Sequence, residues 1–165
     1  MTILYGSDRY VVTAMLVLAL LLASCSPSRD VANQDASARW TSSDPAAFAE
    51  QVTRLTNEVR SSEGLHELEG SDCARDFSLD RAAALVGAGE LKHAPLAPVI
   101  LECSAWTVAA ENLVSSTASP DEVVRAWLKS PGHRANIVDP ELTEIGVGCV
   151  PDGEKMLCSQ LFLGP

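Results

Sequence analysis

The residues whose type and spacing carry the clearest chemistry are cysteines, because pairs of cysteines can form disulfide bonds. The chain has five cysteines, and four of them follow residue 70: Cys73, Cys103, Cys149 and Cys158. Four cysteines allow three pairings. Residues 144–150 and 156–163 are apolar runs that flank the turn-forming sequence Pro-Asp-Gly at 151–153. This pattern predicts a β-hairpin.

The hairpin selects one of the three pairings. If Cys149 and Cys158 lie directly opposite each other, their Cα atoms fall within disulfide range. The same register sets two further pairs opposite each other, Val147 with Gln160 and Ile145 with Phe162. We therefore predict a Cys149–Cys158 bond and, by elimination, a Cys73–Cys103 bond. In the chain-entropy model the two closures contribute about 3 and about 4 kcal/mol.

The fifth cysteine, Cys25, directly follows an apolar segment. Residues 11–23 are apolar or nearly so, which is shorter than the roughly 20 residues that span a bilayer and is typical of a secretion signal. Leu22-Ala23-Ser24-Cys25 resembles the lipobox of bacterial lipoproteins. The resemblance implies cleavage before Cys25 and lipid on its thiol. The alternative is an ordinary secretory signal followed by a free cysteine.

This interpretation divides the chain into three parts. Residues 1–24 are the expected lipoprotein signal peptide, residues 25–43 the lipidated cysteine with a polar, flexible tether, and residues 44–165 the folded domain. Two or more acyl chains hold a protein stably on a membrane without a spanning helix. We therefore expect a protein of the bacterial cell membrane or envelope, lipid-anchored and facing outside the cytoplasm. An oxidising compartment also disfavours the alternative of four reduced, buried thiols.

Charge and composition exclude other classes. The 165 residues carry 12 Lys and Arg against 22 Asp and Glu, a net charge of −10. That sign repels phosphate backbones, so we expect no nucleic-acid partner. The chain is 47% hydrophobic and 21% charged, which is typical of one globular domain and not of a disordered chain. We expect a monomer.

Helical patterns occupy much of the predicted domain. Asp44 and Pro45 begin the first, Gly64 ends it, and its apolar stripe is Phe48, Val52, Leu55 and Val59. A second helix is predicted over 71–87. No element is predicted over 99–114.

The clearest helix start lies near residue 119. Ser119, Pro120 and Glu122 form a capping box, followed by a buried face at 123–128. Ser130-Pro131 repeats the cap-and-proline signal, so a short helix is predicted to hold residues 133–137.

The segment 110–150 resembles the CAP superfamily of cysteine-rich secretory proteins, antigen 5 and pathogenesis-related proteins, in its bacterial branch. Three blocks carry the resemblance: Ala-Glu-Asn-Leu at 110–113, Trp-Leu-Lys-Ser-Pro-Gly-His-Arg-Ala-Asn-Ile at 127–137, and Ile-Gly-Val-Gly at 145–148. The resemblance extends over 55–164. It implies an α+β fold, an α-β-α sandwich with a small, mainly antiparallel sheet between helices.

The family's cleft is built from two histidines and acidic residues. The resemblance implies that His93, Glu111 and His133 take these places here, with Asn112 beside them. Many animal members carry a second glutamate where this chain has Ser130, so a mechanism that needs four such groups is in doubt.

Three interpretations of the cleft remain open. His93, His133 and Glu111 could hold zinc or another divalent metal through three ligands, leaving one position free. The same groups could instead form a hydrogen-bonded network that shapes a binding cleft, or a His–Glu pair for acid–base catalysis. No serine or cysteine nucleophile motif accompanies them, so an enzyme is not the first expectation.

The first expectation is a membrane-anchored binding protein. Its unidentified ligand would be a lipid-like molecule, a peptide or an envelope component. The alternatives are a metal-dependent hydrolase of the cell envelope and a structural or adhesive surface protein.

Overall fold

The computed structural model describes residues 44–103 and 106–165. The predicted signal peptide, the lipidation site at Cys25 and the tether lie outside these residues. The elements, in chain order, are α1 (Pro45–Ser62), β1 (Glu69–Gly70), α2 (Asp72–Leu85), α3 (Ala97–Glu102), β2 (Val108–Ser116), α4 (Pro120–Lys129), α5 (Pro131–Ile137), β3 (Glu144–Asp152) and β4 (Lys155–Gly164).

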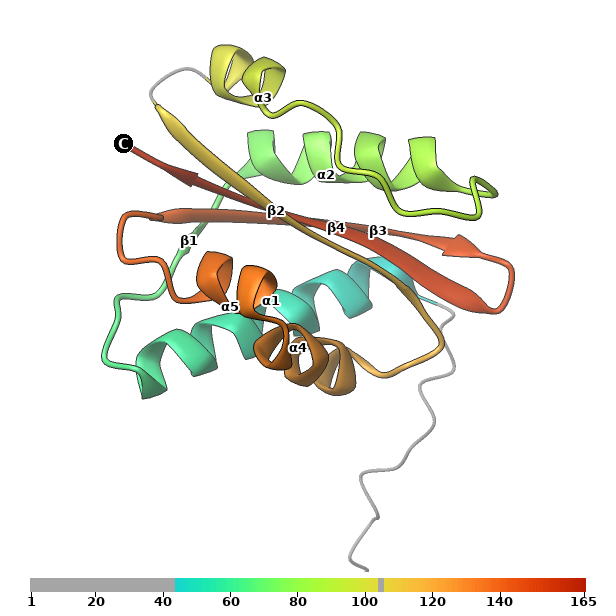
Figure 1. Ribbon diagram of the computed structural model, residues 1–165, viewed down its shortest axis with the longest axis horizontal. Coiled ribbons are helices and arrows are strands. Elements are labelled where there is room, and N and C mark those ends of the chain that lie inside the picture. The colour runs from blue at the N-terminus through green and yellow to red at the C-terminus, as the bar shows by residue number, and fades with distance from the viewer. Residues whose placement is uncertain (1–43, 104–105) are drawn as a thin grey trace, which may run out of the picture. The chain divides into compact units, whose positions relative to one another are not determined.

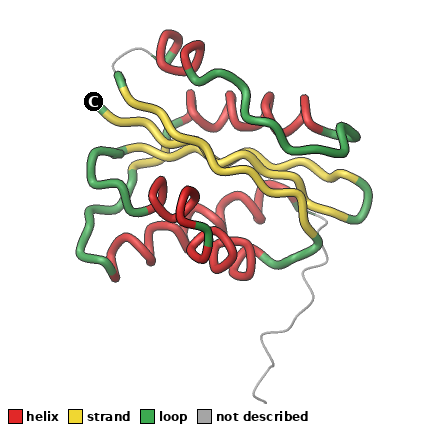
Figure 2. Tube along the Cα trace, viewed as in Figure 1, coloured by secondary structure: helices red, strands yellow, loops and turns green. Residues whose placement is uncertain are grey.

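The strands form a sheet with helices on both faces. The strand order is β1-β3-β4-β2; β1 pairs with β3 in parallel, and the other pairs are antiparallel. Helices α1, α4 and α5 cover one face, and α2 and α3 cover the other (Figure 1). Figure 2 shows the same layers coloured by secondary structure. The predicted α-β-α sandwich is confirmed.

Each face of the sheet has its own apolar core. On the α1 side the core includes Phe48, Trp127, Ile145 and Phe162. On the α2 side it is smaller and includes Ala74, Val99, Leu161 and Leu163, with Trp106 packed against them. Alternate residues of a strand point to opposite faces, so neighbouring β4 residues supply both cores.

The hairpin has the predicted register. Cys149 lies opposite Cys158, Val147 opposite Gln160, and Ile145 opposite Phe162. Both predicted disulfides, Cys149–Cys158 and Cys73–Cys103, are present. The Cys73–Cys103 bond links the first turn of α2 to the end of α3. It therefore restrains the loop between these two helices, which contains His93.

The glycines of β3 allow α2 to pack closely on the sheet. A Cβ atom added at Gly146 would lie 2.1 Å from the backbone nitrogen of Arg75, and one at Gly148 would lie 2.2 Å from that of Leu79. The facing helix residues are small, and Ser78 Oγ donates a hydrogen bond of 3.0 Å to the Gly146 carbonyl. In the Ile-Gly-Val-Gly sequence, the side chains of Ile145 and Val147 therefore pack toward α1, whereas Gly146 and Gly148, which have no side chain, let α2 approach the backbone of β3.

Helix α1 differs from its predicted stripe in the last turns. Phe48 and Val52 are buried as predicted, but the buried line continues through Thr56 and Arg60, whereas Leu55 and Val59 are only partly buried. The physical reason is that Arg60 satisfies backbone carbonyls in the loops that follow α1 and α5. Its guanidinium donates to the carbonyls of His66, Ile137, Asp139 and Leu142.

Burial lowers the pKa of Arg60, although nearby Asp139 partly offsets this. A cation at this position is held by neutral carbonyl dipoles more than by a countercharge.

The other predicted helix signals hold with one correction. Asp44 and Ser71 cap α1 and α2 with their side chains, and Ser119 and Glu122 form the capping box of α4. The short helix α5 forms, but the side chain of Ser130 makes no capping hydrogen bond. The stretch 99–114, for which the sequence predicts no element, contains the end of α3 and most of β2. Within the described ranges, no helix is long and apolar enough to cross a membrane.

Candidate functional site

Glu111 is the centre of the predicted cleft. It lies on β2, the edge strand of the sheet, and its side chain is only 2% exposed. Its Oε1 accepts hydrogen bonds from Ser159 Oγ at 2.8 Å and from Arg81 Nη1 at 3.3 Å, and its Oε2 lies 2.7 Å from His93 Nδ1. A buried carboxylate needs such partners, because burial without them is costly.

Arg81 connects Glu111 to the loop that carries His93. From α2, its guanidinium also donates to the carbonyls of Ala94 at 3.2 Å and Pro95 at 2.6 Å. Arg81 therefore neutralises the buried carboxylate and holds the backbone directly after His93.

His93 is the exposed member of this group, with 57% of its side chain exposed. A carboxylate accepts hydrogen bonds and does not donate them, so Nδ1 of His93 carries the hydrogen in its contact with Glu111. The other ring nitrogen, Nε2, is then an acceptor when the ring is neutral and a donor when the ring is protonated.

His133 reaches the same region from the opposite layer, on α5. The Asn112 side chain donates to the His133 carbonyl at 3.3 Å, and the His133 and Trp127 rings lie 6.3 Å apart. Partial burial lowers the pKa of His133, and the nearby charge of His93 lowers it further. The His133 imidazole is therefore held neutral near pH 7.

A chain of amides fixes α5 against the sheet. Asn112 Nδ2 donates to Gln160 Oε1 at 2.9 Å, and Asn112 Oδ1 accepts from Asn136 Nδ2 at 2.9 Å. Gln160 in turn donates to Thr56 Oγ1 on α1 at 2.9 Å. This buried network sets the position of His133, so Asn112 and Asn136 act as supports of the cleft.

The structure thus brings His93 and Glu111 into contact and places His133 within electrostatic reach of His93. Asn112 contacts the His133 backbone. Ser130 lies between α4 and α5, and none of the side-chain hydrogen bonds among the described residues connects it to Glu111 or to either histidine. The other histidine, His66, is exposed in the loop after α1, as expected for a solvated residue.

The predicted metal ligands do not fit a metal ion in this arrangement. Among the described residues, no three His, Cys, Asp or Glu side chains form a group that could hold one. The reason lies in the partners of Glu111: both of its oxygens are engaged, one of them by a guanidinium. To reach the carboxylate, a divalent ion would have to displace Arg81 and Ser159 from Oε1, or His93 from Oε2.

Two members of the site were not predicted. Ser159 belongs to a polar pair, Ser159-Gln160, inside the otherwise apolar strand β4, and that interruption is a signal the sequence does carry. Arg81 precedes a run of alanines on α2, and nothing in the local sequence distinguishes it from a solvated arginine. Its role follows only from its contact with Glu111, 30 residues later in the chain.

A hollow of about 310 Å³ lies beside the Arg81–Glu111 pair. Its walls come from α2, from the loop after His93 and from α3, and they include Phe77, Leu85, Pro95 and Pro98. An apolar recess therefore adjoins the polar groups of the cleft.

Comparisons with known proteins agree with this architecture. The model of the cysteine-rich secretory protein family, CAP, matches residues 53–162. The uncharacterized protein YkwD of Bacillus subtilis is 30% identical over 125 residues, 72% of this chain and 48% of that protein. The chain thus spans about half the length of this relative.

Solved structures show the same fold. An extracellular protein of Bacillus anthracis that contains an SCP domain superposes with a TM-score of 0.64 at 23% identity, over 72% of this chain and 41% of that one. An outer surface protein of Borrelia burgdorferi superposes with a TM-score of 0.67 at 20% identity, over 73% and 95%. The chain belongs to the CAP family of cysteine-rich secretory proteins.

Proposed function

We propose that this chain is an exported, membrane-anchored bacterial lipoprotein whose CAP domain binds a small polar ligand of the cell envelope in the cleft at Glu111. The lipobox-like sequence at 22–25 supports the anchor. Similarity to bacterial proteins described as extracellular and as an outer surface protein supports the location outside the cytoplasm.

One observation carries the binding proposal: a buried carboxylate holds an exposed imidazole in a fixed orientation. Glu111 and Arg81 cancel each other's charge, and His93 presents Nε2 outward. Nε2 of His93 accepts a hydrogen bond when the ring is neutral and donates one when it is protonated, and the neutral ring of His133 lies nearby. The cleft therefore offers oriented hydrogen-bonding groups to hydroxyls and amides, which both donate and accept. We therefore expect a ligand with such groups, of which sugars and short peptides of the envelope are the main sources.

A metal-dependent hydrolase is less well supported. The metal ligands do not form a group, and the carboxylate that would act as a general base is already engaged by three partners. The Ser159 hydroxyl bonds to Glu111 rather than to a histidine and is fully buried, so it is not placed as a nucleophile.

The cleft is tested with soluble peptidoglycan fragments as the probe. The full chain in detergent micelles should bind them in calorimetry, and His93→Ala should weaken binding by about tenfold through loss of an oriented hydrogen bond. His66→Ala is the matched control, because it removes an exposed histidine outside the cleft. A chelator should leave binding unchanged. Absence of binding, or equal binding by both variants, would remove the proposal and favour a structural or adhesive role.

The anchor is tested separately. Cys25→Ala should release the protein from the membrane fraction, whereas the neighbouring change Ser26→Ala should leave it there. Firm retention of Cys25→Ala would contradict the lipid anchor without affecting the cleft.

A further inference from the structure

Strand β3 has an open edge. Along its whole length β3 pairs with β4, but on the other side β1 pairs only with Glu144 and Ile145. After Gly70 the chain turns into α2, and the last contact is the hydrogen bond from the Ser71 amide to the Ile145 carbonyl at 2.9 Å. Beyond this point, no described strand covers β3.

The backbone groups that face this edge follow from the register. Cys149 and Cys158 have Cα atoms 4.1 Å apart, the spacing of a non-hydrogen-bonded pair, so the N–H and C=O of Cys149 point away from β4. Val147, two residues earlier, has the same orientation. The Ile145 carbonyl, which accepts a hydrogen bond from the Ser71 amide, shows that this side of β3 faces β1 and the start of α2 and not β4. Among the described residues, no backbone group or side chain bonds to Val147 or Cys149 from that side.

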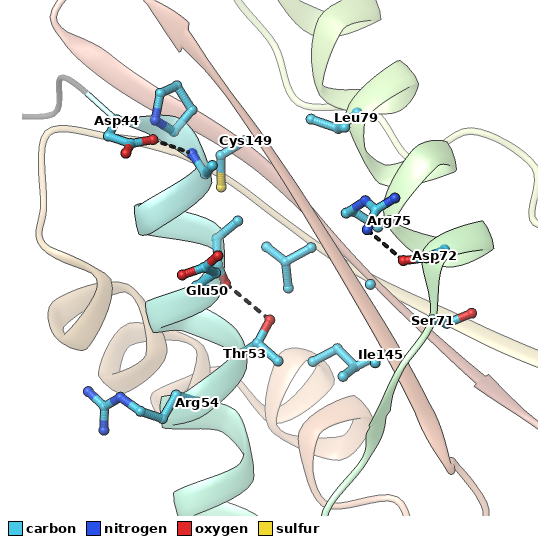
Figure 3. A pocket seen from close by; sticks show the side chains of 16 residues that line it. Asp44, Glu50, Thr53, Arg54, Ser71, Asp72, Arg75, Leu79, Ile145 and Cys149 are labelled. Carbon is cyan, nitrogen blue, oxygen red and sulfur yellow. Dashed lines mark hydrogen bonds and ion pairs between the residues drawn. The ribbon is translucent and has the colours of Figure 1, made fainter.

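These groups lie in a groove and not on a convex surface. Val147 and Cys149 are only 5% and 3% exposed, and they form the floor of a hollow of about 700 Å³ between α1 and α2. Figure 3 shows Glu50 and Thr53 of α1 on one side, and Arg75 and Leu79 of α2 on the other. Backbone groups that are shielded from water and unpaired are costly, so the floor favours an occupant that pairs with them.

The occupant that matches this floor is an extended polypeptide. Alternating N–H and C=O groups along a strand edge are complementary to another strand, and the side chains of an added strand would contact the two walls in turn. Pro151, which has no N–H, ends the row of donors, so only a short strand fits.

The walls indicate the side chains of such a peptide. The lining is mainly apolar and includes Ala46, Ala49 and the partly exposed Leu79. Both cations of the lining, Arg54 and Arg75, already pair with carboxylates: Arg54 with Glu58, and Arg75 with Asp72 and Asp76. Glu50 pairs with no cation among the described residues. The rim therefore carries an uncompensated negative charge, which favours a peptide with a basic side chain.

We propose that the groove between α1 and α2 binds an extended, basic and apolar peptide segment of another protein as an added strand on β3. This site is distinct from the cleft at Glu111, which lies at the opposite edge of the sheet on β2.

The test uses the full chain, isotope-labelled and held in detergent micelles, with a short peptide of alternating valine and lysine as the probe. Binding should protect the amides of Val147 and Cys149 from hydrogen exchange. The same peptide with all of its backbone amides N-methylated keeps its charge but has no N–H to donate to β3 from either edge, so it should bind at least about fivefold more weakly. Equal binding of both peptides would overturn strand addition.

Two variants locate the site. Glu50→Lys should weaken binding of the unmodified peptide by about fivefold, whereas Glu154→Lys, the same charge change in the exposed β3–β4 turn, should not. Val147→Pro removes a groove-facing N–H and should lower the affinity further. Amides of Val147 and Cys149 that are already protected without peptide, together with no peptide binding, would show that the chain's own N-terminal segment occupies the edge and would refute an external partner.

Discussion

The guanidinium of Arg81 lies 3.3 Å from the Glu111 carboxylate, and both side chains are nearly buried, at 10% and 2% exposed. Because the pair also anchors the loop after His93, it couples the stability of the domain to the geometry of the cleft.

Replacing Arg81 with Ala should destabilise the domain by about 3–5 kcal/mol, because Glu111 would keep its burial and lose its countercharge. Chemical denaturation measures the change. Arg75→Ala is the control on the same helix, since its partners Asp72 and Asp76 are exposed, and it should lower the unfolding free energy far less than Arg81→Ala does. Equal losses for both variants would contradict the structural role of Arg81.

Replacing Gly148 with Ala should cost at least about 3 kcal/mol, because the added Cβ would meet backbone at 2.2 Å and α2 would have to move away from the sheet. Gly132→Ala on α5 is the matched control, with no atom within 4 Å of the added Cβ, and its effect should stay within about 1 kcal/mol. Thermal or denaturant unfolding compares the two. A tolerated Gly148→Ala would show that α2 does not pack closely on β3.

The two disulfides should contribute unequally to stability. The Cys73–Cys103 bond closes a separation of 30 residues and the Cys149–Cys158 bond one of 9, which gives about 4 and about 3 kcal/mol in the chain-entropy model. Paired Cys→Ala variants, measured by denaturation, should follow this order. Mass mapping of the non-reduced protein should give a peptide linking Cys149 to Cys158, and a link from Cys103 to either of them would contradict the connectivity.

The parts of the fold that could be predicted depend on local patterns. The β3–β4 register follows from a turn sequence, an alternation of apolar residues and two cysteines within 20 positions, and all three agree. The capped starts of α1, α2 and α4 are also local. The pairing Cys73–Cys103 followed by elimination, because the hairpin left no other partner.

The parts that could not be predicted depend on distant partners. Arg60 is buried because carbonyls at 137, 139 and 142, far along the chain, face it, and no helical periodicity reveals them. Arg81 likewise depends on Glu111. The residue types of His93, His133 and Glu111 indicated metal binding. Whether the Glu111 carboxylate is free to bind a metal, however, depends on Arg81 and Ser159, which are distant from it in the sequence.

Domain stability should fall on acidification partly through His133. Burial and the charge of His93 hold the pKa of the folded His133 below its ordinary value of 6.5. As the pH falls through about 6.5, His133 becomes protonated in the unfolded chain but stays neutral in the folded chain. Proton binding therefore favours the unfolded state until the pH reaches the lower pKa of the folded His133. Above that range His133 is neutral in both states and contributes nothing to the pH dependence.

His133→Gln removes this proton uptake and should flatten the decline in unfolding free energy between about pH 7.5 and about pH 5.5. His66→Gln, at an exposed loop position, is the control for the loss of an imidazole outside the cleft. Denaturation curves at several pH values measure both slopes. A steep decline that persists unchanged in His133→Gln would show that other groups cause the acid sensitivity, and it would remove the basis for a neutral imidazole in the cleft.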